Sequence, residues 1–188
     1  MDALDALLNR VSAPRLIAPA PDAAQRELLF RAALRAPDHG QLRPWRFLTV
    51  EGEARVQLGE LFASTLAAEA STDALAKVRG MPLRAPLLVV VIARVQANGK
   101  IPVQEQLLAA GCAAHGILLA AHAQGIGAVW RTGDMAYNPQ VAAGLGLAAN
   151  EQVIAYLYLG TPERELRAVP VLHVSDFVRC WPASDDLG

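Results

Sequence analysis

The chain has 188 residues, of which 53% are hydrophobic, and its formal net charge is −1 at pH 7. This length suffices for one domain with a hydrophobic core. The near-neutral charge argues against a nucleic-acid binder, because affinity for a phosphate backbone needs a surplus of positive charge. The mean hydropathy of +0.26 is high for a monomer, so we expect the excess apolar surface to lie in a subunit interface.

The N-terminus and the cysteines indicate a cytoplasmic protein. Residues 1–5 carry two acids and no basic segment, so we expect no secretory signal. The longest nearly apolar run, 107–121, is shorter than the roughly 20 residues that span a bilayer, so we expect no membrane contact. Cys112 and Cys180 fit no metal or redox spacing, which predicts free thiols in a reducing compartment.

The first half of the chain predicts helices and one strand around a polar loop. Helices are expected at 2–10, from Asp22 to about Arg35, at 53–70 and at 72–80, with a strand at 45–50. Asp22 followed by Gln25 has the pattern of a capping box, and Pro37 stops the helix that this box begins. Residues 37–44 are rich in turn-forming residues and predict a loop.

The second half predicts three strands, a long apolar helix and a tail. Strands are expected at 87–93, 126–130 and 153–159, and helices at 102–124 and from Asn138-Pro139 to the glycines at 144 and 146. The helix at 102–124 is apolar nearly all round, which predicts burial on most sides. Residues 161–188 pack only if another surface receives them. By itself, the alternation of strands and helices favours a parallel, doubly wound sheet.

The segment 125–133, Gly-Ile-Gly-Ala-Val-Trp-Arg-Thr-Gly, joins the long helix to a strand. A dinucleotide-binding loop runs the other way, from strand through glycines into helix. We expect Gly125 to end the helix and Gly127 to let the backbone approach something flat or bulky. Trp130 and Arg131 would add an aromatic face and a cation, which suits a planar phosphorylated cofactor. A ligand-free joint between helix and strand fits the segment equally well.

Cationic and hydroxyl residues lie near the ends of the predicted elements. A phosphate with nearly two negative charges needs more than one fixed cation and further donors. Arg10, Ser12 and Arg131 form such a set, and Arg35 and His39 are candidates to extend it. Taken singly, each arginine is more simply a solvated surface side chain.

No catalytic or metal-binding set stands out among the side chains. His115 and His122 lie about 10.5 Å apart along a helix axis, too far to bind one zinc with nitrogens at about 2.1 Å. No serine or cysteine triad and no acid pair is suggested. We therefore expect a cofactor that brings its own chemistry.

Four segments in this order resemble the FMN-dependent nitroreductase family, in its compact NAD(P)H nitroreductase type. The segments are Asn9-Arg10-Val11-Ser12 with Arg15 nearby, Arg35 to His39 leading to Pro44-Trp45-Arg46-Phe47, Gly125 to Gly133, and Tyr158-Leu159-Gly160-Thr161-Pro162. The resemblance covers nearly the whole chain, from residue 10 to residue 160. It implies one α+β domain over 1–188, with a mixed sheet flanked by helices, in place of a doubly wound sheet.

The resemblance also implies an intertwined homodimer with two FMN sites at its interface. The helix at 102–124 would lie at the dimer core, and residues 161–188 would reach across to the partner. The implied FMN residues are Arg10, Val11, Ser12, Arg15, Arg131, Thr132 and Gly133 from one subunit, with Arg35 and His39 from the other. The stretch Ala121, His122, Ala123, Gln124, Gly125 and Ile126 resembles one assigned to NAD(P). Arg15 or Arg10 is expected to stabilise the reduced flavin.

The implied activity is hydride transfer from NADH or NADPH to FMN and then to a nitroaromatic, quinone or similar planar acceptor. Val11 departs from a second arginine in many relatives, and Gln41 and Arg43 depart from asparagine and glutamine. The altered loop favours one alternative, a flavin-binding sensor or store without turnover. Another alternative is different flavin chemistry on the same scaffold, which usually needs a lid that this chain has little room for.

Overall fold

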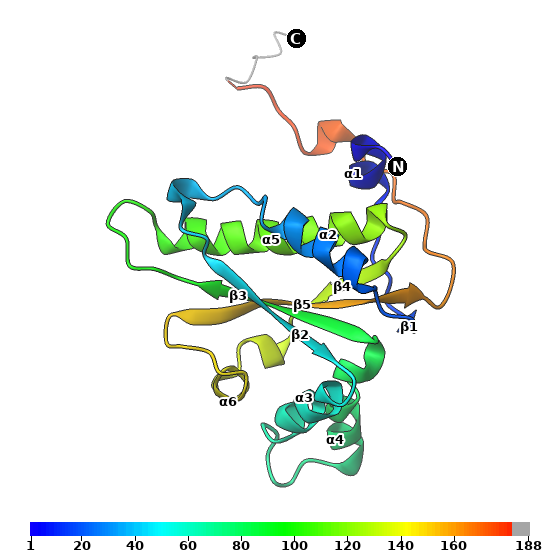
Figure 1. Ribbon diagram of the computed structural model, residues 1–188, viewed down its shortest axis with the longest axis vertical. Helices are drawn as coiled ribbons and strands as arrows, with labels where there is room; N and C mark the ends of the chain where they lie inside the picture. The colour runs from blue at the N-terminus through cyan, green and yellow to red at the C-terminus, as the bar shows by residue number, and fades with distance from the viewer. Residues whose placement is uncertain (182–188) are drawn as a thin grey trace, which may run out of the picture.

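The structure is a computed structural model that describes residues 1–181 as an antiparallel sheet with helices on both faces (Figure 1). The strands are β1 (Leu16–Ile17), β2 (Trp45–Glu51), β3 (Leu87–Arg94), β4 (Gly127–Arg131) and β5 (Glu151–Pro162). The order is β2-β3-β5, and β5 also pairs with β4 over Gly127–Arg131 and with β1 near its end. All these pairings are antiparallel. The α+β prediction is confirmed, but the described strands show no parallel pair of a mixed sheet.

Helices α2 and α5 cover one face of the sheet, and α3, α4 and α6 lie on the other (Figure 1). The helices are α1 (Ala3–Asn9), α2 (Ala23–Ala33), α3 (Ala54–Ala63), α4 (Thr72–Arg79), α5 (Val103–Ala123) and α6 (Pro139–Gly144), with 3-10 turns η1 (His39–Gln41), η2 (Pro82–Arg84), η3 (Asp134–Ala136) and η4 (Val174–Asp176). The helix predicted over 53–70 is wrong in its second half. The Ser64 and Thr65 hydroxyls donate to carbonyls of the last turn, each at 2.8 Å, and so compete with helix continuation.

Strand β3 lies in the middle of the sheet and is buried on both faces. Its odd-numbered residues from Leu87 to Ala93 face α2 and α5, and its even-numbered residues from Leu88 to Ile92 face the other layer. Side chains of both sets are 0% exposed. Such a strand is a continuous apolar run, the pattern typical of parallel sheets. The alternation of strands and helices wrongly favoured a doubly wound sheet, because β2 and β3 are joined through helices yet pair antiparallel.

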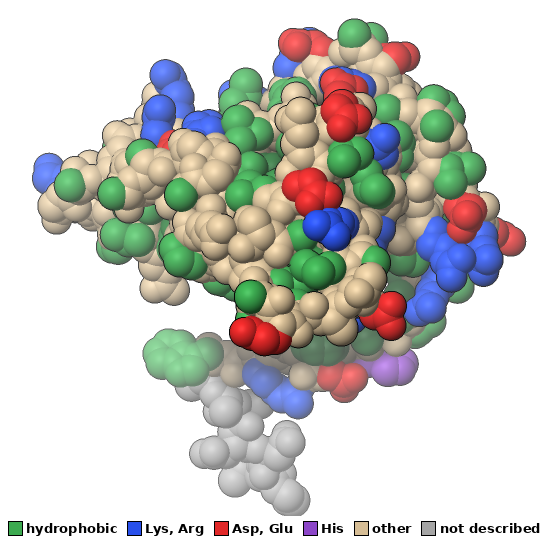
Figure 2. Space-filling model, turned by 90° about the horizontal axis from the view of Figure 1, so that it is seen from below, with side chains coloured by type: hydrophobic (Ala, Val, Ile, Leu, Met, Phe, Trp, Pro, Cys, Tyr) green, Lys and Arg blue, Asp and Glu red, His purple; other side chains and the backbone are tan. Residues whose placement is uncertain are grey.

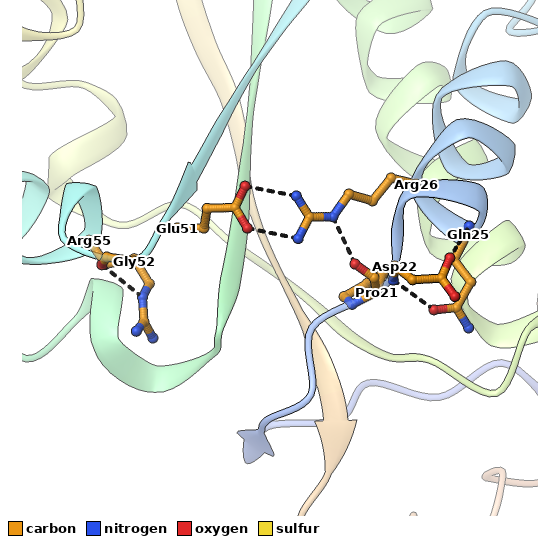
Figure 3. Close-up of polar contacts among 7 residues, drawn as sticks. All are labelled: Pro21, Asp22, Gln25, Arg26, Glu51, Gly52 and Arg55. Atoms are coloured by element: carbon orange, nitrogen blue, oxygen red, sulfur yellow. Dashed lines mark hydrogen bonds and ion pairs between the residues drawn. The ribbon is translucent and has the colours of Figure 1, made fainter.

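The predicted capping box begins α2 and leads to an ion pair with the sheet. The Gln25 N–H donates to Asp22 Oδ1 at 2.8 Å, and the Asp22 N–H donates to Gln25 Oε1 at 2.9 Å. The next residue, Arg26, donates twice to Glu51 at 2.8 and 2.7 Å and once to Pro21 O at 2.8 Å (Figure 3). These bonds hold the pKa of Glu51 below its ordinary value and tie α2 to the end of β2.

Helix α5 has one buried and one exposed face, so the prediction of burial on most sides is wrong for the single chain. Ala110, Ala114 and Ile117 are 0% exposed against the sheet, whereas Leu108 is 61% exposed. Cys112 on the exposed face is a free thiol, as predicted. Within residues 1–181, α5 is one helix whose length and composition would allow it to cross a membrane.

Two arms with exposed apolar side chains extend past the layer of α2 and α5, away from the sheet (Figure 1). In α1, Leu4, Leu7 and Leu8 are exposed. The C-terminal arm is residues 163–181, and its exposed large apolar residues are Val169, Val171, Leu172, Val174, Phe177, Val178 and Trp181. The predicted tail at 161–188 is thus extended as far as it is described, and residues 182–188 lie outside the described part.

Candidate functional site

Three adjoining hollows form a groove at the sheet edge where β1 and β4 meet, here called the edge groove. The outer hollow, of about 290 Å³, is lined by Ser12, Ala13, Pro14, Arg15, Arg164, Glu165, Leu166 and Arg167. The middle hollow, of about 430 Å³, is lined by Pro14, Arg15, Leu16, Arg84, Arg131 and Glu163. The inner hollow, of about 340 Å³, is lined by Phe62, Met81, Arg84, Arg131, Thr132, Gly133, Met135, Tyr156 and Tyr158. Shared residues join each hollow to the next.

The edge groove brings together five residues that the sequence assigned to FMN. These residues are Ser12, Arg15, Arg131, Thr132 and Gly133. The Ala13 N–H donates to Ala128 O at 2.9 Å, which holds the N-terminal segment against β4. Arg10 and Val11 directly precede this segment and are half-buried, but they do not line the three hollows. Segments about 120 residues apart in sequence therefore meet at one edge of the sheet.

The guanidinium of Arg131 has donors that the described residues leave unused. Its Cζ lies 5.7 Å from the ring centroid of Tyr158. Its Nη2 donates to Pro14 O at 3.5 Å, the outer limit of a hydrogen bond. Its Nε is buried without a hydrogen-bond partner in residues 1–181. A buried donor without a partner is costly, so Arg131 is suited to an anionic or hydrogen-bond-accepting ligand.

Trp130 and Arg131 point to opposite faces of the sheet, so within one chain they do not form the joint aromatic and cationic surface that the sequence suggested. Alternate residues of a strand face opposite sides. A Cβ on Gly111 of α5 would lie 4.0 Å from the Trp130 ring, whereas Arg131 lies over Tyr158 on the other face. The aromatic partner of Arg131 comes from β5, and only the register between β4 and β5 could have revealed it.

The two glycines of the joint have separate roles. Gly125 has a φ of +73° just past the end of α5, and its N–H donates to His122 O at 2.9 Å, as expected for a helix-ending glycine. A Cβ at Gly127 would come within 2.5 Å of Leu16 Cδ2 and 2.9 Å of Pro162 Cγ. The close approach that Gly127 allows is therefore to β1 and the end of β5.

His39 lies far from the edge groove, and Arg35 does not line it. His39 Nδ1 lies 2.6 Å from Glu105 Oε2, in the first turn of α5, whereas Ala13 is bonded to β4, beyond the last turn. The 21 residues of α5 span about 30 Å. One chain therefore cannot bring His39 and Ser12 to the same FMN, which fits the expectation that they come from different subunits.

The loop that carries the two departures from the family pattern has an unusual backbone. Gln41 and Arg43 have φ values of +52° and +49°, a region that L-residues rarely adopt. The Arg43 N–H donates to Asp38 Oδ2 at 2.7 Å, and Leu42 O accepts from Gln96 Nε2 at 2.6 Å. These bonds hold the loop in its strained form, and such strain is concentrated at functional sites.

The stretch assigned to NAD(P), Ala121 to Ile126, forms the C-terminal end of α5 and the turn after it. The Ile126 N–H donates to Ala121 O at 2.9 Å, and His122 Nε2 is buried without a partner in the described part of the chain. The carbonyl end of a helix disfavours phosphate. Among residues 1–181, no group of three or more histidine, cysteine, aspartate or glutamate residues is placed to hold a metal.

The fold is that of nitroreductase-like proteins. A "Nitroreductase-like Family Protein" from Bacillus cereus superposes with a TM-score of 0.86 at 20% identity, with 97% of each chain covered. A "putative nitroreductase in complex with fmn" from Desulfovibrio desulfuricans gives 0.73 at 23% identity, with 94% of this chain and 95% of that chain covered.

The chain belongs to the nitroreductase family, whose family model matches residues 16–161. It is 41% identical over 177 residues to the Escherichia coli (strain K12) protein named "Putative NAD(P)H nitroreductase YdjA". That similarity covers 94% of this chain and 96% of the relative. The resemblance inferred from four short segments is therefore confirmed.

Proposed function

We propose that this chain is an FMN-dependent oxidoreductase that uses NADH or NADPH to reduce nitroaromatics, quinones and similar planar acceptors. The observation that carries the proposal is the edge groove, where Arg131 offers unused donors beside Ser12 and Arg15. The names of the relatives support it, since one similar structure is described as bound to FMN and one similar protein as an NAD(P)H nitroreductase.

The two ends of the edge groove match the two ends of FMN. The outer hollow offers the Ser12 hydroxyl and the cations Arg15, Arg164 and Arg167, a set suited to a phosphate. The inner hollow has apolar and aromatic walls that include Phe62, which suit a planar ring. We therefore place the phosphate in the outer hollow and the ring toward the inner hollow. When bound, FMN accepts hydride from NAD(P)H and passes it to the acceptor.

We further propose that the working form is an intertwined homodimer with two FMN sites. The exposed face of α5, the leucines of α1 and the apolar C-terminal arm are surfaces that a second copy would cover. The dimer would bring Arg35 and His39 of one subunit to the edge groove of the other. The C-terminal arm would pack on the partner subunit, as the family resemblance predicts for a tail that packs only if another surface receives it.

The reaction would proceed in two half-reactions at one ring face. Binding and electrostatics would be the protein's part, because the cofactor supplies the redox chemistry. Ser12 and Arg10 would hold the phosphate, and Arg131 would hold the ring edge. On the face shown in Figure 2, acidic and basic side chains are intermingled, and no surface of one charge stands out there. We therefore propose that the partners of this chain are small molecules in the cytoplasm. The NAD(P) role of residues 121–126 stays a prediction.

The test is the colour of the purified protein. The proposal predicts a yellow protein that bleaches with NADH or NADPH and regains colour on addition of a nitroaromatic or quinone. A yellow protein that never bleaches would favour the sensor or store. A colourless protein that takes up no added FMN would contradict both.

A further inference from the structure

We propose that Arg84 is a second cation of the flavin site, acting with Arg131 on the polar edge of the ring. This inference rests on the proposed function and deepens it, because it assigns a ligand role to a residue outside the four segments that resemble the family. The expected consequence is that Arg84 stabilises the reduced, negatively charged form of the flavin more than the oxidised form.

The backbone at Arg84 is held in place by buried neighbours. Arg84 ends the 3-10 turn η2, and β3 begins three residues later at Leu87. Pro82 and Ala85 are buried, and the carbonyl of Ala85 accepts from Arg55 Nη1 at 2.8 Å. The exposed side chain of Arg84 therefore starts from a fixed point at the wall of the edge groove.

Arg84 and Arg131 border the same space from two different elements, the turn η2 and strand β4. Both residues line the middle hollow and the inner hollow. Both also act on the Tyr158 hydroxyl, because burial raises the pKa of Tyr158 while the charges of Arg84 and Arg131 oppose that rise. The geometry thus places two guanidinium groups around one aromatic side chain, where the inner hollow opens to the middle one.

The charges of this pair are not balanced by the described chain. In residues 1–181, no carboxylate lies within 4.0 Å of the Arg84 or Arg131 guanidinium, whereas Arg15 lies 3.6 Å from Glu163. The carboxylate of Glu163 in the middle hollow is thus paired with Arg15 and does not pair with Arg84 or Arg131. A ligand that brings negative charge between Arg84 and Arg131 would relieve their mutual repulsion.

The walls around the pair favour the ring over the phosphate as the group that Arg84 contacts. The inner hollow beside Arg84 is lined by Phe62, Met81, Met135 and Tyr156, a setting suited to a planar, largely apolar group. The hydroxyl and cations suited to a phosphate lie at the opposite end. Negative charge on the reduced flavin is concentrated at N1 and the C2 oxygen. Arg84 and Arg131 would meet that edge, with Arg15 less effective because of Glu163.

The experiment compares Arg84→Ala, Arg84→Lys and the control Arg79→Ala in the full-length protein. Arg79 is nearby in sequence and is paired with Glu60 at 2.9 Å, and it does not line the edge groove. Affinities for FMN and for riboflavin, which lacks the phosphate, are measured by quenching of flavin fluorescence. The midpoint potential of the bound flavin is measured by dye equilibration.

For Arg84→Ala we expect a loss of FMN affinity of about fivefold to tenfold, with riboflavin affinity falling by the same factor. We expect the reduced flavin to be weakened about tenfold more than the oxidised one, which lowers the two-electron potential by about 30 mV. Arg84→Lys should keep most of the potential, and Arg79→Ala should match the unaltered chain.

Unchanged affinity and potential in Arg84→Ala would overturn the inference. Loss of FMN affinity with unchanged riboflavin affinity would also overturn it, because Arg84 would then bind the phosphate. If Arg84→Ala misfolds, Arg84→Lys still decides. This variant keeps the positive charge, so a fall of its midpoint potential by about 30 mV or more would contradict a role of charge at position 84. An unaltered chain that binds neither flavin contradicts the proposed function itself.

Discussion

The centre of the sheet and the two arms contain similar apolar residues in opposite environments. Leu87 to Ala93 in β3 are 0% exposed, whereas Leu8 in α1 is 68% exposed and Trp181 in the C-terminal arm is 94% exposed. The apolar surplus of the sequence therefore divides into a core that stabilises one subunit and a surface that a second copy would cover. Helix α5 belongs to both, because one face packs on the sheet and the other is exposed.

The largest expected effect separates the two faces of α5. Ile117→Ala removes a side chain that is 0% exposed and should lower the free energy of unfolding by about 2–5 kcal/mol, because it leaves a cavity. Leu108→Ala, on the exposed face, should change the stability of the subunit by less than about 0.5 kcal/mol but weaken the dimer. Urea unfolding at several protein concentrations measures both. If both variants lost the same free energy of unfolding at every protein concentration, the division of α5 into a core face and an interface face would be contradicted.

A second prediction concerns a partly buried ion pair at the start of β5. Arg46 donates twice to Glu151, each time at 2.7 Å, and the Glu151 side chain is 6% exposed. These bonds lower the pKa of Glu151 to about 2. Because the folded pKa is depressed, this stabilisation is present above the unfolded value near 4.5 and is lost as pH falls from about 5 toward 2.

The contribution should be roughly 3 kcal/mol at neutral pH, since each tenfold change in acid strength corresponds to about 1.4 kcal/mol. The measurement is the free energy of unfolding of the unaltered chain and of Glu151→Gln between pH 7 and pH 2. The difference between the two should shrink as the pH falls. A difference that stays constant over that range would show that ionisation of Glu151 contributes nothing.

A third prediction concerns the residue where the N-terminal arm joins the edge groove. Arg10→Ala should weaken FMN binding about tenfold, since a charged hydrogen bond to phosphate contributes roughly 1.5 kcal/mol or more. Arg31→Ala, an exposed change on α2, is the matched control. Flavin content after gel filtration is the measurement. Full occupancy in Arg10→Ala would show that the arm does not supply a phosphate ligand.

The smallest expected effect is at the ion pair in Figure 3. Glu51 is 48% exposed and Arg26 is 25% exposed, so solvent screens their attraction. Glu51→Gln should therefore lower the free energy of unfolding by less than about 1 kcal/mol, measured by urea denaturation. A loss as large as that of Ile117→Ala would mean that the contact between α2 and the sheet depends on this pair more than on apolar packing.

Local signals in the sequence predicted where elements begin and end, but not how strands pair. Asp22 with Gln25 and Gly125 mark helix ends through contacts within a few residues. The direction of the sheet was not predictable from β3, because helices bury both faces of an antiparallel strand here. The contact of Tyr158 with Arg131 was not predicted for the same reason, since it depends on the register between β4 and β5. Arg84 was not singled out because it reaches the groove from the turn η2.

The most direct test of the account is the mass of the purified protein under native conditions, together with its flavin content. The account predicts a particle of two 20.0 kDa chains that releases two FMN molecules when denatured. A 20.0 kDa particle with no affinity for FMN would contradict the claim that two copies of this chain enclose the flavin.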